Sequence, residues 1–194
     1  MDGPASTVSF ELDAPLEVAN WRPLVQWLLA VPHLILSQVL GYVANALALI
    51  SFFAVLFTEK IPEGIYNFQV MVMRYRARVT MYAGFTHESY PKFEFAMSRT
   101  DPGGDPLRLS VEAPPAWKRT NAFNFILAIP HYIVLIVFGI GAVVLWIINF
   151  FIVLFTGKWN ASHRAYIVKV GRYQTIVMAY AMMLRNEYPA FGLS

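Results

Sequence analysis

The chain of 194 residues contains no cysteine. A protein without cysteine forms no disulfide, has no thiolate nucleophile and builds no cysteine-ligated metal site. The absence excludes these chemistries but leaves the redox compartment undecided, because it fits both oxidising and reducing surroundings.

Charged residues are missing from two long stretches. No Asp, Glu, Lys or Arg occurs in the 36 residues between Arg22 and Glu59, or in the 38 residues between Arg119 and Lys158. Each stretch exceeds the roughly 18 apolar residues that indicate a membrane helix. The chain is 57% hydrophobic with a mean hydropathy of +0.49, unlike a typical soluble domain. We therefore predict a predominantly α-helical integral membrane protein.

The sequence contains the same unit twice. Residues 30–93 and 128–191 align without a gap at an offset of 98, with 26 identities in 64 positions. We expect a first repeat over 1–98, a linker over 99–106 and a second repeat over 107–194.

Three short segments alternate polar and apolar residues, as half-buried strands do. They are Val8–Leu12, residues 92–97 and residues 107–112. The last two flank the sequence Asp-Pro-Gly-Gly-Asp-Pro at 101–106, which is typical of a turn. We predict that these two pair as a small β-hairpin between the repeats, and that one strand precedes each hydrophobic stretch.

Pro32 and Pro130 divide the uncharged stretches, because proline lacks an amide proton and clashes with the preceding helical turn. We predict interfacial helices over 21–31 and 117–129, and membrane spans over 33–57 and 131–155. A second helix follows each span, with apolar residues at helical spacing from Phe68 to Tyr82 and again from Tyr166 to Tyr180.

Topology depends on the number of crossings. If the strands of the two repeats share a sheet, both lie on one side of the membrane, which requires an even number of crossings per repeat. Either the second helix returns through the bilayer, which we favour, or each stretch forms a shallow re-entrant hairpin that never fully crosses. Basic residues on the strand side would make that side cytoplasmic.

The short motifs of the repeated unit resemble those of a bacterial, notably actinobacterial, membrane-protein family of unknown function. The resemblance covers most of the chain and is closest in the first repeat; it supports the membrane class and supplies no reaction. We expect a multi-pass protein of the bacterial inner membrane, with the strand-bearing side and the termini in the cytoplasm. The residues that carry it are Trp21-Arg22-Pro23-Leu24, Pro32-His33, Thr58-Glu59-Lys60, Pro62-Glu63-Gly64, Arg74-Tyr75 and Tyr90-Pro91-Lys92-Phe93.

Two equivalent histidines, His33 and His131, are the sharpest candidates for chemistry. If they converge across a two-fold axis, they could bind haem or a metal, or relay protons. The alternative, which we favour, is a helix cap or headgroup contact, because a metal site normally needs three or four ligands.

Four arginines on the second helices are candidates for binding lipid headgroups or anions: Arg74, Arg76, Arg78 and Arg172. Arg74 and Arg172 are equivalent, and each precedes a tyrosine. Helical spacing places Arg74 and Arg78 on one face, with Arg76, Gln69 and Thr80 roughly opposite. The alternative, which we favour for Arg74 and Arg172, is that each arginine bonds a carbonyl and clamps its own unit.

Small residues such as Gly41, Gly139 and Gly141 let helices approach closely, and we expect them to mark packing between the repeats. We find no serine elbow, phosphate loop or His-Glu-x-x-His helix, so we expect no enzyme activity.

We expect a non-enzymatic membrane scaffold or accessory subunit that contacts anionic lipid and a protein partner or a second copy, without a cofactor. The alternative is a small transport or redox component, with haem or an ion at the repeat interface. The net charge of +3 suits anionic headgroups, and no basic block is dense enough for nucleic acid.

Overall fold

A computed structural model describes residues 8–193 of the chain. The described segment is mostly helical and has one small sheet. Its elements are β1 (Val8–Leu12), α1 (Arg22–Leu29), α2 (Val31–Thr58), α3 (Glu63–Ala83), β2 (Leu107–Val111), the 3-10 helix η1 (Arg119–Phe123), α4 (Asn124–Leu127), α5 (Ile129–Thr156) and α6 (Ala161–Ala181).

Each repeat forms a helical hairpin. The long helix α2 packs against α3, and α5 packs against α6. Proline lies in the first turn of both α2 and α5, which confirms that Pro32 and Pro130 separate the long helices from the shorter ones before them. Each long helix ends at a residue with positive φ, Glu59 at 54° and Gly157 at 66°, so the chain turns sharply into the next helix.

The sheet joins two strands that are far apart in the sequence. β1 pairs with β2 in antiparallel register, with Val8 opposite Val111 and Leu12 opposite Leu107. The predicted hairpin between 92–97 and 107–112 is therefore wrong, and residues 92–97 form no strand. The strand predicted from the alternation at 107–112 is present as β2. Its partner is β1 near the start of the chain, in which Val8 and Phe10 are buried in the core.

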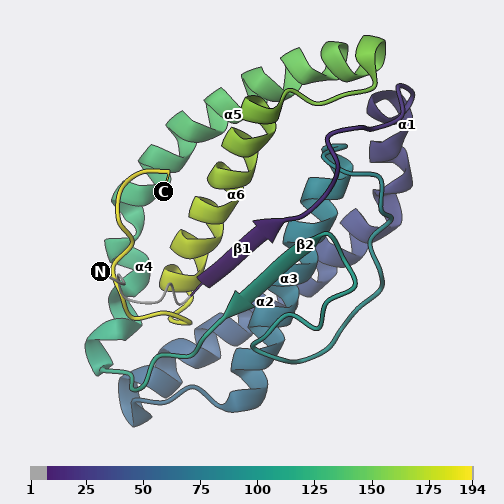
Figure 1. Ribbon diagram of the computed structural model, residues 1–194. Helices are drawn as coiled ribbons and strands as arrows, with labels where there is room; N and C mark the ends of the chain where they lie inside the picture. The colour runs from purple at the N-terminus through teal and green to yellow at the C-terminus, as the bar shows by residue number, and fades with distance from the viewer. Residues whose placement is uncertain (1–7, 194) are drawn as a thin grey trace, which may run out of the picture.

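The two strands are exchanged between the repeats. β2 precedes the second repeat but packs on α3, whereas β1 precedes the first repeat but packs on α6. Figure 1 shows the strands running along these helices. The helices α3 and α6 thus form a middle layer, covered by the sheet and carrying α2 and α5 on their other sides. The two strands therefore share one sheet, as the topology argument assumed.

The outer surfaces of the long helices are apolar and exposed. Two stretches of the described chain, Val31–Thr58 and Arg119–Thr156, are long and apolar enough to cross a membrane. Only 22% and 6% of their most apolar 18-residue windows are buried. On α5, Ile133, Ile136 and Val137 are each more than 60% exposed. The short helices α1 and α4 continue this surface with residues such as Trp27 and Leu127.

Candidate functional site

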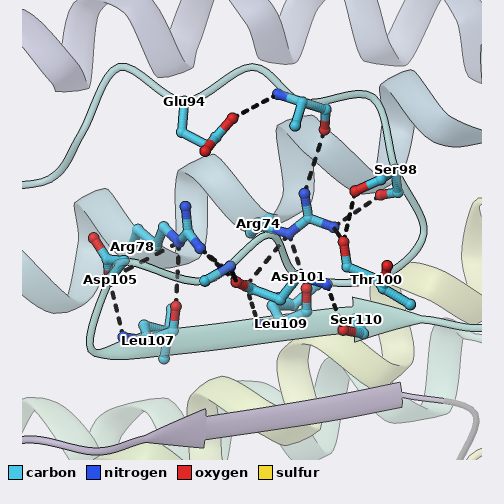
Figure 2. Close-up of polar contacts among 12 residues, drawn as sticks. Arg74, Arg78, Glu94, Ser98, Thr100, Asp101, Asp105, Leu107, Leu109 and Ser110 are labelled. Carbon is cyan, nitrogen blue, oxygen red and sulfur yellow. Dashed lines mark hydrogen bonds and ion pairs between the residues drawn. The ribbon is translucent and has the colours of Figure 1, made fainter.

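Arg74 is buried between α3 and the segment that precedes β2. Its side chain is 2% exposed, and all three guanidinium nitrogens donate to backbone carbonyls. Nε donates to the carbonyl of Leu109 at 2.9 Å, and Nη2 donates to that of Ser98 at 2.8 Å (Figure 2). Arg74 therefore acts as the predicted clamp. Its guanidinium makes four hydrogen bonds to backbone carbonyls, which leaves one N–H group of Nη1 without a partner among the described residues.

Arg78 lies one helical turn further along α3 and is equally buried. Nε donates to the carbonyl of Leu107 at 3.1 Å, and Nη2 contacts both carboxylate oxygens of Asp101, at 2.8 and 3.0 Å. Asp105 lies 3.9 Å away, and burial raises the pKa of its carboxyl group. These contacts fix the turn at 101–106 onto α3 (Figure 2), so Arg78 is also structural.

Arg74, Arg78 and the segment before β2 form hydrogen bonds with the backbone of β2 on the edge that faces away from β1. The amides of Leu107, Leu109 and Val111 donate to Asp105, Asp101 and the carbonyl of Arg99. The carbonyls of the same three residues accept from Arg78, Arg74 and Tyr66. The other edge of the sheet differs, because within residues 8–193 the structure gives the backbone of Phe10 no partner on that side. Of the two described strands, β1 therefore presents free backbone groups at Phe10, to which another strand could add.

Arg172, the equivalent of Arg74 on α6, is partly buried and has no hydrogen bond or ion pair to any described residue. Its Nε is buried without a partner. The clamp is therefore present in the first repeat and absent from the described part of the second.

The two histidines occupy equivalent aromatic boxes. Nδ1 of His33 is hydrogen-bonded to the hydroxyl of Tyr75 at 2.6 Å, and its ring stacks on Phe93 with centroids 4.2 Å apart. The second box repeats this geometry: the distances are again 2.6 Å from His131 to Tyr173 and 4.2 Å to Phe191. Each box fastens the Tyr-Pro-x-Phe segment of a repeat to the start of its own long helix.

The histidines do not converge, as the haem and metal hypothesis required. α2 begins beside α1 and α5 begins beside α4, and these corners lie at opposite ends of the molecule (Figure 1). The reason is that α2 and α5 run in opposite directions, which places equivalent residues far apart unless they lie near the two-fold axis. Across residues 8–193, no group of three or more His, Cys, Asp or Glu is arranged to hold a metal ion.

Arg76 points away from the clamp, as helical spacing predicted. A Cβ atom added to Gly41 of α2 would lie 3.2 Å from Nη1 of Arg76. Arg76 also lines a cavity of about 110 Å³ between α3 and α6, together with Thr80, Gln174 and Thr175. Gln174 is the equivalent of Arg76 at the offset of 98, and the same cavity is lined by the equivalent pairs Met73 and Gly171, Ala77 and Thr175, and Thr80 and Met178. We did not predict Gln174; the signal was a polar residue at the position equivalent to Arg76.

The glycines have a different use from the one predicted. Gly41 makes room for Arg76, and Gly141 makes room for Tyr166, so both serve packing within a repeat. Contact between the repeats occurs instead at Gly171 of α6, where a Cβ would lie 2.6 Å from Met81 Cε and 3.2 Å from Phe10 Cζ.

A buried polar contact attaches α1 to the end of α3. Nε2 of Gln26 donates to the carbonyls of Tyr82 and His87, both at 2.7 Å. The ring of His87 is 2% exposed, and burial lowers its pKa to about 4, with a further lowering by Arg164.

Comparison with known families matches both repeats. Residues 20–94 and 118–192 each match a domain of unknown function, DUF4389. The chain belongs to this family. Its two DUF4389 units correspond to the duplicated segments and exclude both strands of the sheet. Neither the comparison with curated proteins nor that with solved structures gives a match.

Proposed function

We propose that this DUF4389 protein is a non-enzymatic membrane scaffold that rests on one face of the bilayer. Its apolar side, formed by α1, α2, α4 and α5, would be sunk in one leaflet, and the sheet would face water. The observation that carries the proposal is the exposure of the long helices. A core helix of a soluble protein is mostly buried, whereas the most apolar window of α5 is only 6% buried.

The charges on the sheet argue against helices that cross the bilayer. Ala44, at the middle of α2, packs against Met71 and Val72 near the middle of α3. Arg74, also near the middle of α3, bonds Leu109 at the centre of β2. The middle of α2 and the sheet thus lie at the same level along the helices. A perpendicular α2 would place the exposed charges of the sheet in hydrocarbon, at about 2.5 to 3.5 kcal/mol each.

The linker supports the same orientation. Residues 84–118 carry nine charged residues and lead from the end of α3 to η1. η1 lies at the other end of α3, because Arg119 contacts Glu59 in the turn before it, at 3.4 Å. If α3 crossed the bilayer, this charged segment would have to cross beside it. With the helices parallel to the membrane plane, the whole linker stays in water.

Two features suit contact with anionic lipid and with a partner. Lys60, Lys118 and Arg119 are exposed at the ends of the apolar helices, where they would meet phosphate groups. The open edge of β1 suits a strand from a larger membrane assembly. We expect a bacterial inner membrane, and the basic residues favour its cytoplasmic leaflet. The redox alternative has no such support, because the two histidines lie far apart.

Flotation with liposomes tests the attachment. Ile136→Lys with Ile140→Lys places two charges on the exposed face of α5 and should release the protein from vesicles containing phosphatidylglycerol. The matched control, Ser9→Lys with Glu11→Lys, adds charge to the sheet and should float like the wild type. Circular dichroism would confirm that both variants fold. Equal flotation of the two variants would overturn the proposal.

Photo-crosslinking in native membranes tests the scaffold role. A photoreactive residue at Glu11, on the open strand, should give a discrete crosslinked product, whereas one at Arg108, on the closed strand, should give much less. A product of the same yield at both positions, or none at either, would contradict partner binding at this edge.

A further inference from the structure

Arg76 differs from nearly all other described arginines because its charge is unused. Within residues 8–193, its guanidinium has no hydrogen bond and no ion pair. Arg74 and Arg78 on the same helix are hydrogen-bonded, and Arg22, Arg99, Arg108, Arg119 and Arg185 each contact a carboxylate. A partly buried cation without a counter-ion favours an anion nearby.

The surroundings of Arg76 contain donors and no competing carboxylate. Three neighbouring hollows share Arg76 as a lining residue, and none of the three is lined by Asp or Glu. Their polar lining comes from amides and hydroxyls, including Gln38 and Asn45 of α2, Thr80 of α3, and Gln174 of α6. Amide N–H and hydroxyl groups around one guanidinium match the acceptor oxygens of a phosphate group.

The position of the hollows indicates where such a phosphate would come from. The hollow along α2 opens between Leu34, Ile35 and Val39, which are 40 to 63% exposed. These residues belong to the apolar face of α2, while Arg76 lies on α3 in the middle layer. With the apolar face in the leaflet, the guanidinium would lie deeper in the protein, at headgroup level, and acyl chains would meet the apolar residues at the opening.

We propose that the groove between the two helical hairpins binds the phosphate of one membrane phospholipid at Arg76, with Thr80 and Gln174 as further donors. The inference rests on the proposed membrane attachment and names its lipid ligand. Only one repeat supplies the cation, since the equivalent residue is Gln174, so the groove takes one phosphate rather than a symmetric pair. The ligand class is a phosphate diester carrying acyl chains.

Native mass spectrometry of the detergent-solubilised protein tests this site, with dioleoylphosphatidylglycerol as the titrated lipid. The wild type should bind one lipid tightly, and Arg76→Gln should weaken this binding at least about ten-fold, because it removes a charge-assisted contact. Gln174→Leu should weaken it less. The matched control is Arg108→Gln, an exposed arginine on the sheet and outside the groove, which should bind like the wild type.

Two further measurements separate the sources of phosphate and the two proposals. Inorganic phosphate at millimolar concentration should not displace the lipid; displacement would identify a free-anion site and overturn the lipid assignment. Arg76→Gln should still float with liposomes, so that loss of the bound lipid with intact flotation supports the groove. Wild-type lipid binding by Arg76→Gln would overturn the proposal while leaving membrane attachment standing.

Discussion

Glu11 of β1 stands directly opposite Arg108 of β2, so the exposed side of the sheet carries a cross-strand pair of opposite charges. Leu109, the neighbour of Arg108 in β2, accepts a hydrogen bond from Arg74, which lies near the middle of α3. Charged side chains therefore lie at the same level as the centres of the helices. This relationship is the reason for placing the helices parallel to the membrane rather than across it.

The aromatic boxes predict equal effects in the two repeats. Tyr75→Phe should leave Nδ1 of the buried His33 without a partner and lower the free energy of unfolding by about 1 to 3 kcal/mol. Tyr173→Phe should do the same at His131. Thermal unfolding in detergent would measure both, with the exposed Tyr42→Phe as control. Unchanged stability in both box variants would show that these hydrogen bonds are unimportant.

The arginine clamp predicts a large effect of a single carboxylate. Asp101→Ala removes the carboxylate that contacts both buried arginines, Arg74 and Arg78, leaving only Asp105 at 3.9 Å from Arg78, and should cost about 3 to 5 kcal/mol of unfolding free energy. Asp13→Ala removes the exposed partner of Arg108 and should change it by at most about 1 kcal/mol. Chemical denaturation in detergent distinguishes the two, and equal losses would contradict the clamp.

His87 predicts a loss of stability in acid. Its folded pKa of about 4 lies below the ordinary histidine value of 6.5, so the unfolded chain binds the proton more readily. Stability is therefore fully present above pH 6.5 and falls as the pH drops, by about 3 kcal/mol at pH 4. His87→Gln should flatten this part of the unfolding profile relative to the wild type. Parallel profiles would show that His87 is not the group responsible.

Gly171 predicts where the repeats touch. Gly171→Leu should force α6 away from Met81 and Phe10 and lower the unfolding free energy by about 1 to 3 kcal/mol. A Cβ added at Gly139 would meet no described atom within 4 Å, so Gly139→Ala should be neutral or stabilising because alanine favours helix. An unfolding free energy lower for Gly139→Ala than for Gly171→Leu would contradict the observed packing.

Local features of the chain were predictable from sequence. The offset of 98 predicted the two repeats, and the prolines predicted where the long helices begin. The alternation of polar and apolar residues predicted both strands. The helix starts and the strands depend mainly on residues close in sequence. The pairing of β1 with β2 was not predictable, since the two strands lie about 100 residues apart and residues 92–97 offer a similar pattern. Their exchange between the repeats depends on tertiary packing alone.

The candidate site was predictable in part for the same reason. Helical spacing correctly put Arg74 and Arg78 opposite Arg76 on α3. Helical spacing does not predict which face of α3 packs against the sheet. It therefore could not predict which arginines form the clamp. Equivalence in the repeats suggested that His33 and His131 would meet, but the equivalent residues that share a cavity lie on α3 and α6 and include Arg76 and Gln174.

Cysteine labelling tests the central claim most directly, because the natural chain has no thiol. Lys60→Cys and Ser89→Cys place exposed thiols beyond the two ends of α3, and Ser9→Cys places one on the sheet. In sealed vesicles of known orientation, a membrane-impermeant maleimide should reach all three from the same side. Ile136→Cys, on the apolar face, should react only after detergent is added. Labelling of Lys60→Cys and Ser89→Cys from opposite sides would show that α3 crosses the bilayer and would contradict the account.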